Sequence, residues 1–343
     1  MSPDALFDTP SPEVTPAQAG RLAEVFIEGV AAVEPLGGER DRNFRVTDRQ
    51  GRAFVLKVLH FAEDPAVSDF HLQALLHVAR RDPGVPVPRA MSTLDGSGHE
   101  YLWRVDGLPD RRVHLLSYLP GAPLNTVGRS DAQRSSVGRA LAQLDAALSD
   151  YRHPAQHTRL LWDVQHVLGV RPMLPSIDEP EARRLAEIAL DRFERRVSPQ
   201  LPGLRRQVIH NDFNPYNLLV DPSDIDRLTG VIDFGDMVHA TLVQDVATAA
   251  AYFVSLDGPA MSGPAALVRG FHAVTPLTDT ERSLLPDLMA ARLALAVAVS
   301  SFRAAAHPDN APYILKNRPI AVAGLARLAA LAEGEGADML KNN

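Results

Sequence analysis

One polar segment in the second half of the chain constrains the fold more than any other. Residues 207–236 read QVIHNDFNPYNLLVDPSDIDRLTGVIDFGD. Three short apolar runs, typical of strands, alternate here with polar loops. The runs are 207–209, 218–220 and 230–232. Because strand ends hold neighbouring loops in place, we expect Asp212, Asn217 and Asp233 to converge at one site.

The spacing of these three residues is typical of phosphoryl-transfer enzymes. Asp212 and Asn217 fit the pattern H-x-D-x-x-x-x-N, in which the Asp accepts or orients the substrate hydroxyl proton and the Asn binds Mg²⁺. Asp233 opens a D-F-G triplet, which holds the same metal. Turn formation alone explains the polar residues at 221–224. It does not explain the combination of Asp212, Asn217 and the D-F-G triplet at these spacings. We therefore predict Asp212 as the catalytic residue and Asn217 and Asp233 as Mg²⁺ ligands.

Length and composition indicate a globular protein of about two domains. The chain has 343 residues, of which 45% are hydrophobic, and a net charge of −7, which argues against a broad surface for nucleic acid or an anionic membrane. It contains no cysteine, so disulfides, thiolate metal sites and cysteine nucleophiles are excluded, and we expect a cytoplasmic protein. The apolar run 293–299 is too short to cross a bilayer and is predicted to be a buried helix.

The hydrophobic pattern changes from strand-like to helical along the chain. We expect a flexible leader at 1–16 and a helix at 17–33, followed by a β-rich region with one helix. The expected strands are 34–36, 43–47, 53–59, 101–105 and 111–119, and the helix is 69–80. Beyond residue 121, the segments 131–148 and 180–195 carry apolar residues along one helical face.

These patterns predict an α+β fold with the bilobal plan of the protein kinases. The expected parts are a β-rich nucleotide-binding lobe at 17–116, a hinge at 117–121, a mostly helical catalytic and substrate lobe at 122–335, and a flexible tail at 336–343.

The β-rich lobe contains candidate nucleotide-binding residues. Lys57, in an otherwise apolar strand, resembles the lysine that pairs with the α and β phosphates, although a lone strand lysine often only prevents aggregation. Gly37, Gly38 and Asn43 lie in a turn where backbone N–H groups could approach phosphates, or in a simple hairpin. At the hinge, the backbone of Ser117 and Leu119 is expected to pair with the purine.

The polar residues around the catalytic segment have predicted supporting roles. Asp245 is expected to accept hydrogen bonds from the catalytic-loop backbone, and His210 to support that loop. Asp236 is either a solvated loop charge or a contact for an amine-bearing substrate. The helix that would steer Lys57 offers His71 where a protein kinase has glutamate, so the partner of Lys57 stays open.

Four segments resemble the aminoglycoside phosphotransferase and choline kinase superfamily, and most closely its hydroxylysine-kinase-type branch. They are GGERDRNFRV at 37–46, HLLSYLPGAPL at 114–124, HNDFNPYNLLV at 210–220 and GVIDFGDMVHATLVQDVATAAAY at 230–252. The resemblance spans about residues 30–310 and implies that Asp212 is the base, that Asn217 and Asp233 bind Mg²⁺, and that Lys57 binds phosphate. Pro215 departs from the acidic residue expected there.

Two features separate the chain from protein kinases. Asn211 replaces the arginine of H-R-D, and only 11 residues separate Asp233 from Asp245, too few for an activation segment. We therefore expect a small-molecule kinase that uses ATP or GTP with Mg²⁺ on a hydroxyl of a small, amine-bearing metabolite, with a hydroxylysine-like amino alcohol favoured. The alternatives are homoserine, choline, ethanolamine or an aminoglycoside as acceptor, and a nucleotide-binding pseudokinase scaffold. The sequence does not reveal the oligomeric state.

Overall fold

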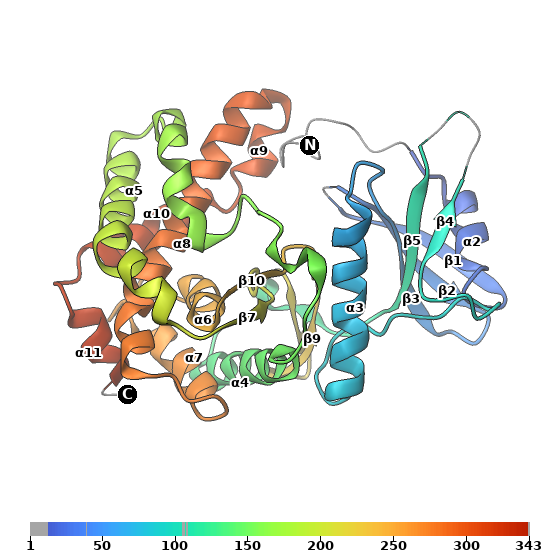
Figure 1. Cartoon of the computed structure of the whole chain (residues 1–343), viewed down its shortest axis with the longest axis horizontal. Coiled ribbons are helices and arrows are strands. Elements are labelled where there is room, and N and C mark those ends of the chain that lie inside the picture. The colour runs from blue at the N-terminus through green and yellow to red at the C-terminus, as the bar shows by residue number, and fades with distance from the viewer. Residues whose placement is uncertain (1–12, 39, 105–106, 108, 342–343) are drawn as a thin grey trace. The chain divides into compact units, whose positions relative to one another are not determined.

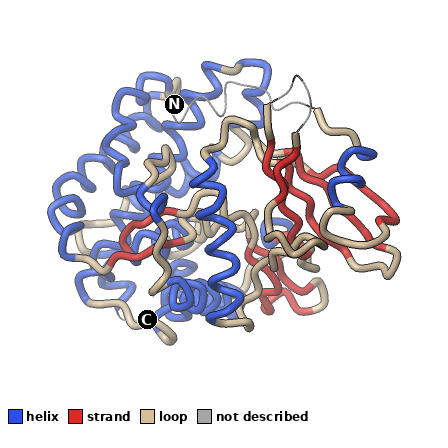
Figure 2. The backbone as a smooth tube through the Cα atoms, turned by 45° about the vertical axis from the view of Figure 1, so that its right-hand side comes forward, coloured by secondary structure: helices blue, strands red, loops and turns tan. Residues whose placement is uncertain are grey.

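The computed structural model describes residues 13–38, 40–104, 107 and 109–341 (Figure 1). The chain divides into two compact units, the first comprising Met1–Pro120 with His153–Thr158, and the second Gly121–Arg152 with Arg159–Asn343. The first unit is built on one sheet and the second is mostly helical (Figure 2), so the predicted α+β fold is confirmed. The assignment of 153–158 to the first unit was not expected from sequence.

The first unit contains a five-stranded antiparallel sheet in the order β1-β2-β3-β5-β4. Its strands are β1 (Val30–Leu36), β2 (Arg42–Asp48), β3 (Ala53–Val58), β4 (Tyr101–Trp103) and β5 (Arg111–Ser117), and its helices are α2 (Pro16–Ala23) and α3 (Pro65–Arg81). The predicted helix at 17–33 is wrong beyond residue 23. Gly29 adopts a left-handed φ of 69°, which a helix does not accommodate, and the following residues pair with β2 instead.

The leader and the end of strand β4 are only partly described. Residues 1–12 of the predicted leader, Glu39 of the glycine turn and residue 105 of the predicted strand lie outside the described residues. Helix α2 begins at Pro16 after Thr15, whose hydroxyl accepts a hydrogen bond from the Gln18 N–H and forms a capping box with that residue. Helix α2 therefore begins at the last residue of the segment predicted as leader.

The two faces of the sheet carry different chemistry. Helix α2 packs on the apolar face, where Leu22 and Phe26 join Phe44 of β2 and Leu56 of β3 in one core. Because side chains alternate along a strand, Lys57 points to the opposite face. That face is polar.

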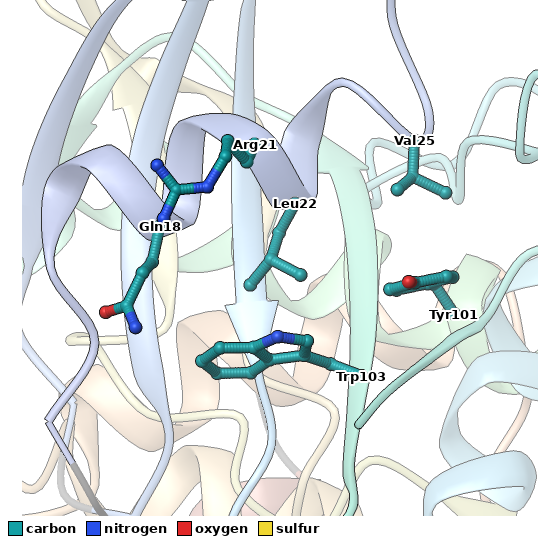
Figure 3. A pocket seen from close by; sticks show the side chains of 6 residues that line it. All are labelled: Gln18, Arg21, Leu22, Val25, Tyr101 and Trp103. Carbon is teal, nitrogen blue, oxygen red and sulfur yellow. The ribbon is translucent and has the colours of Figure 1, made fainter. Parts of the chain in front are cut away.

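A hollow of about 300 Å³ lies between α2 and β4 (Figure 3). It is lined by Gln18, Arg21, Leu22, Val25, Tyr101 and Trp103, with Leu22 directly above the Trp103 ring. Because these residues belong to the apolar face of the sheet, the hollow is separated by the sheet from Lys57.

The second unit is organised around a long helix, α8 (Asp279–Ala306), as Figure 1 shows. The other helices are α4 (Asp131–Leu148), α5 (Pro180–Arg192), α6 (Leu242–Ala251), α7 (Ser262–His272), α9 (Ala311–Ile314), α10 (Arg318–Ala329) and α11 (Glu335–Lys341). Among the described residues, α8 alone is long and apolar enough to cross a membrane, but 83% of its apolar window is buried inside the protein. The predicted burial of 293–299 is thus confirmed.

Helix α11 occupies most of the segment expected to be a flexible tail. Ala337 and Leu340 are buried on it, so apolar residues at 336–341 pack against the unit, and that prediction is wrong there. Helix α5 also ends three residues earlier than predicted, where the chain continues as a short π-helical turn at Phe193–Val197.

Two small sheets of the second unit carry the segment 207–236. Strand β7 (Arg206–Ile209) pairs with β10 (Val238–Thr241), and β8 (Leu218–Asp221) lies between β6 (Ala122–Pro123) and β9 (Asp224–Val231). The expected turn between β8 and β9 is present, because Asp221 Oδ1 accepts a hydrogen bond from the Ser223 N–H at 2.8 Å. The strands predicted from hydrophobic runs therefore flank the polar loops as expected.

Helices α4 and α7 approach closely because each has a glycine at the contact. A Cβ atom on Gly138 would lie 2.0 Å from the Leu267 carbonyl oxygen, and one on Gly270 would lie 2.0 Å from the Ser135 carbonyl oxygen. Both obstacles are backbone atoms, which cannot turn aside as a flexible side chain can. The two helices must therefore separate if either glycine gains a side chain.

We predict that Gly138→Ala destabilises the protein by about 1–3 kcal/mol, the usual cost of overpacking a core. At about 2–4 °C per kcal/mol for a unit of this size, Tm in a thermal melt should fall by several degrees. Gly203→Ala is the control, because a Cβ there meets nothing within 4 Å. If the two variants had the same Tm, the close approach of helices α4 and α7 at Gly138 would be contradicted.

Candidate active site

The loop after β7 is fixed by a carboxylate from helix α6. Asp245 Oδ2 accepts a hydrogen bond from the His210 N–H at 2.9 Å, and its Oδ1 accepts one from the Asn211 N–H at 2.8 Å. Asp245 is fully buried, and the Gln244 side chain donates to Asn211 Oδ1 at 2.9 Å. Asp245 therefore makes the contacts with the catalytic-loop backbone that the sequence analysis expected.

Backbone strain marks two residues of the segment. Asn211 and Asp233 have φ values of 64° and 63°, and they are the two non-glycine residues with positive φ in the described part of the chain. Such left-handed conformations cost energy and persist where surrounding contacts enforce them, often at functional sites. At Asn211 the enforcing contacts are those from Asp245 and Gln244.

His210 joins the catalytic loop to the strand that precedes Asp233. Its Nδ1 accepts a hydrogen bond from the Asp212 N–H at 3.3 Å, and its Nε2 lies 3.2 Å from the Ile232 carbonyl oxygen. Since a carbonyl only accepts, Nε2 carries the proton. Burial lowers the pKa of His210, which agrees with this neutral ring. The predicted supporting role of His210 thus has a defined geometry.

Asp212, Asn217 and Asp233 lie close together in the second unit. The Asn217 side-chain amide donates to Asp212 Oδ2 at 2.8 Å and to the Asp212 carbonyl at 3.0 Å, while the Asn217 carbonyl accepts from the Ile232 N–H at 2.9 Å. Burial raises the pKa of Asp212, and the charge of Asp233 raises it further, whereas Arg292 opposes the rise. Two carboxylates that repel each other in this way favour a cation between or beside them.

The donor set fits Mg²⁺ bound with nucleotide phosphates. Among the described residues no group of three or more His, Cys, Asp or Glu side chains is positioned to hold a metal by itself. Mg²⁺ is commonly bound through one or two carboxylates, with phosphates and water completing its shell. Asp233 is exposed, and the Asn217 amide nitrogen faces Asp212, which leaves the Asn217 side-chain oxygen as the ligand atom.

Arg292 of helix α8 contacts the candidate base directly. One of its terminal nitrogens donates to Asp212 Oδ1 at 2.8 Å, and only 3% of the Arg292 side chain is exposed. The sequence analysis assigned no role to Arg292. The available signal was a single arginine inside an apolar helical run, which requires a partner once the helix is buried.

Asp236 lies near this cluster. It is half-buried. Burial lowers the pKa of Arg292, whereas Tyr252, Asp212 and the negative charge of Asp236 raise it, and the net effect is a raised pKa. Its predicted contact with a substrate amine stays a prediction.

In the first unit, Asp41 pairs with Lys57. The Lys57 ammonium nitrogen lies 3.3 Å from Asp41 Oδ2, and Asp41 Oδ1 accepts a hydrogen bond from the His60 N–H at 3.0 Å. The acid therefore comes from the glycine turn, whereas a protein kinase supplies it from a helix. The sequence suggested a partner on the helix that carries His71, and Asp41 was not predicted. Asp41 lies 16 positions before Lys57 in the chain and meets it only through the pairing of two strands.

The glycine turn has a specific geometric requirement. Asn43 is the cross-strand neighbour of Lys57, and its side-chain amide donates to the Gly37 carbonyl at 3.3 Å. A Cβ on Gly38 would lie 2.8 Å from the Asp41 carbonyl oxygen, a backbone atom, and 2.4 Å from that same amide nitrogen, so the turn needs glycine there. Gly37, Gly38 and Asn43 thus form one local structure beside Lys57.

The predicted hinge contacts need one correction. The Ser117 N–H donates to the Arg89 carbonyl at 2.8 Å, and Ser117 Oγ accepts from the Arg89 N–H at 2.9 Å. This N–H is therefore already bound within the first unit and is not available to a purine. The role of Leu119 stays a prediction.

Asp145 of helix α4 forms a buried carboxyl pair with Asp245. Both Asp145 oxygens are inaccessible, and in the described part of the chain neither accepts a hydrogen bond from an N–H or hydroxyl group. Burial, and then the charge of Asp245, raise the pKa of Asp145 well above its ordinary value. Burial raises the pKa of Asp245 as well, but the nearby His210 and the two backbone N–H groups that Asp245 binds oppose that rise, so Asp145 is the member of the pair that retains a proton more readily.

We predict that Asp145→Asn gains stability relative to the wild type as the pH rises from 5 to 8. In the wild type the unfolded chain releases the Asp145 proton above a pH of about 4, while the folded chain retains it. The free energy of unfolding therefore falls as the pH rises toward the pKa of Asp145 in the folded protein. An asparagine amide can still donate to Asp245 and does not titrate. Thermal melts across this range measure the difference, with exposed Asp150→Asn as the control. A constant difference in Tm would show that Asp145 is ionised in the fold.

Comparisons with known proteins give matches over most of the chain. A model described as the phosphotransferase enzyme family matches residues 32–295. Hydroxylysine kinase from Mus musculus is 28% identical over 325 residues, covering 89% of this chain and 86% of that protein. Homoserine kinase from Methylobacillus flagellatus is 29% identical over 271 residues, covering 77% and 75% respectively.

The fold also matches a solved structure of similar size. A microcompartment-associated aminopropanol kinase superimposes with a TM-score of 0.71 at 22% identity, covering 91% of this chain and 96% of that one. At this identity the match supports the fold.

Proposed function

Since the chain belongs to the phosphotransferase enzyme family and is a small-molecule kinase, we propose that it transfers the γ-phosphoryl group of ATP or GTP to a hydroxyl of a small, amine-bearing metabolite. A hydroxylysine-like amino alcohol is the favoured acceptor. The observation that carries this proposal is the Asp212 carboxylate, fixed by Asn217 at 2.8 Å and placed beside Asp233.

Each residue has a defined task in the proposed reaction. Asp212 accepts a hydrogen bond from the acceptor hydroxyl and aligns its oxygen with the γ-phosphorus; the new O–P bond forms as the bond to the β-phosphate oxygen breaks. The hydroxyl proton passes to Asp212, and ADP or GDP leaves. Asn217 and Asp233 would hold Mg²⁺, which neutralises charge on the phosphate oxygens. Lys57 of the first unit supplies a further positive charge for the phosphates.

The choice of an amine-bearing acceptor rests on charge. Asp236 lies close enough to Asp212 and Arg292 to influence the same cluster, and the sequence from 231 to 268 carries four aspartates and no lysine or arginine. An ammonium group would offset part of this negative charge. The similar proteins include hydroxylysine kinase, homoserine kinase and aminopropanol kinase, which are all named for short acceptors with an amine and a hydroxyl.

A panel of acceptors tests the proposal. Release of ADP or GDP would be measured with hydroxylysine, homoserine, 1-amino-2-propanol, choline, ethanolamine and an aminoglycoside, each with ATP and with GTP. Efficient turnover of hydroxylysine is the expected result. A preference for another alcohol would revise the acceptor, and Mg²⁺-dependent nucleotide binding without turnover of any alcohol would favour a pseudokinase scaffold.

We predict that Asp212→Asn lowers kcat by roughly 10²–10⁴-fold, the usual contribution of a positioned acid or base. Nucleotide binding should change little, since in the proposed reaction the phosphates are held by Lys57 and the metal ligands. Steady-state kinetics and nucleotide titration measure the two effects. Asp224→Asn, an exposed aspartate of the β8–β9 turn, is the matched control. Near-normal turnover by the Asp212 variant would remove it from the mechanism.

A further inference from the structure

Arg292 occupies an unusual place for a charged residue. It lies within the apolar run of α8, between buried Leu288 and Leu295, and only 3% of its side chain is exposed. A buried guanidinium is costly unless its charge is paired and its N–H groups are bonded. The contacts of Arg292 therefore indicate why helix α8 carries it.

The guanidinium is held by three separate segments of the second unit. One terminal nitrogen donates to Asp212 Oδ1 at 2.8 Å and to the Tyr252 hydroxyl at 3.3 Å, and the other donates to the Trp162 carbonyl at 3.2 Å. The rings of Trp162 and Tyr252 also lie 5.6 and 5.9 Å from the guanidinium carbon. These contacts fix the guanidinium plane, and through it the direction of its bond to Asp212.

The two carboxylate oxygens of Asp212 have different partners. Arg292 binds Oδ1 at 2.8 Å and Asn217 binds Oδ2 at 2.8 Å, which fixes the rotation of the carboxylate group. Each oxygen still has a lone pair for another donor. The catalytic loop itself carries no lysine or arginine from 210 to 220, so the cation comes from α8, 80 positions away.

We propose that Arg292 is a positioning residue for phosphoryl transfer, holding the Asp212 carboxylate in the orientation that receives the acceptor hydroxyl. This inference rests on the proposed function. In a loose transition state the carboxylate acts chiefly by aligning the hydroxyl, so its orientation matters more than its basicity. An error of about 1 Å in such alignment can cost about 10²-fold in rate.

A different role for Arg292 would be to bind a carboxylate of an amino-acid substrate. Its burial and its existing bonds to Asp212, Tyr252 and Trp162 favour the positioning role. The two roles predict different kinetics, because a positioning residue changes kcat for every acceptor, whereas a carboxylate receptor changes KM for acceptors that carry a carboxylate.

Kinetics of the full-length protein test the proposal. Arg292→Ala should lower kcat about 10²-fold with both hydroxylysine and the carboxylate-free 1-amino-2-propanol, with little change in KM for nucleotide. Arg292→Lys should recover part of this loss. Added guanidinium should restore turnover of the alanine variant, whereas urea, which is similar in shape but neutral, should not. Arg282→Ala, which removes a more exposed arginine of the same helix, is the control and should behave as wild type.

Three kinetic results would overturn the proposal. A rise in KM confined to carboxylate-bearing acceptors would assign Arg292 to substrate binding. Unchanged kcat in Arg292→Ala would exclude a positioning role, and equal rescue by urea and guanidinium would reduce Arg292 to packing.

A measurement without substrate tests the coupling between Arg292 and Asp212 independently of the proposed function. Arg292→Lys, Asp212→Asn and the double variant would be compared in thermal melts. Because each single change disturbs the same buried pair, the double variant should lower Tm by less than the sum of the two singles. Additive shifts would overturn the coupling. If the wild type phosphorylates no acceptor, the proposed function fails while this coupling is still decided by the melts.

Discussion

The Asp245 carboxylate is the contact on which the catalytic segment depends. It binds two successive backbone N–H groups, those of His210 and Asn211, and so stabilises a left-handed residue immediately before Asp212. Because both of its oxygens accept hydrogen bonds from backbone N–H groups, the ionised form of Asp245 is favoured, and the raised pKa of the neighbouring Asp145 allows the pair to carry a single negative charge. The core of the second unit thereby sets the backbone position of the candidate base.

From that anchor, hydrogen bonds extend to each candidate group of the second unit. The His210 ring connects the Asp212 N–H to Ile232, the residue before Asp233, and Asn217 connects the Asp212 side chain to the same residue. Arg292 completes the arrangement from helix α8. A small-molecule kinase with no activation segment has its catalytic groups assembled by the fold itself, since packed core residues do not need a phosphorylated loop to hold them.

Sequence patterns predicted the site best where function and local structure depend on the same short segment. The helix at 131–148 follows from helical periodicity, and the strands around Asp212 follow from short continuous apolar runs, which are buried in β8 and at the end of β7. The errors occurred at the ends of elements. The helix expected at 17–33 ends at Ala23, and Gly29, with its left-handed φ, lies directly before the strand that replaces the last part of that helix. At 336–341, two buried apolar residues belong to helix α11 in a segment that was expected to be a tail.

The sequence by itself determined the family and the α+β fold, and it identified the candidate catalytic segment, because Asp212, Asn217 and Asp233 lie close along the chain at a spacing typical of phosphoryl-transfer enzymes. Only the tertiary structure identified the partners of these groups. Asp41 reaches Lys57 through strand pairing, and Arg292 reaches Asp212 through helix packing across 80 positions. Contacts between distant residues leave no periodic signal in a single sequence, because they depend on which faces are buried together.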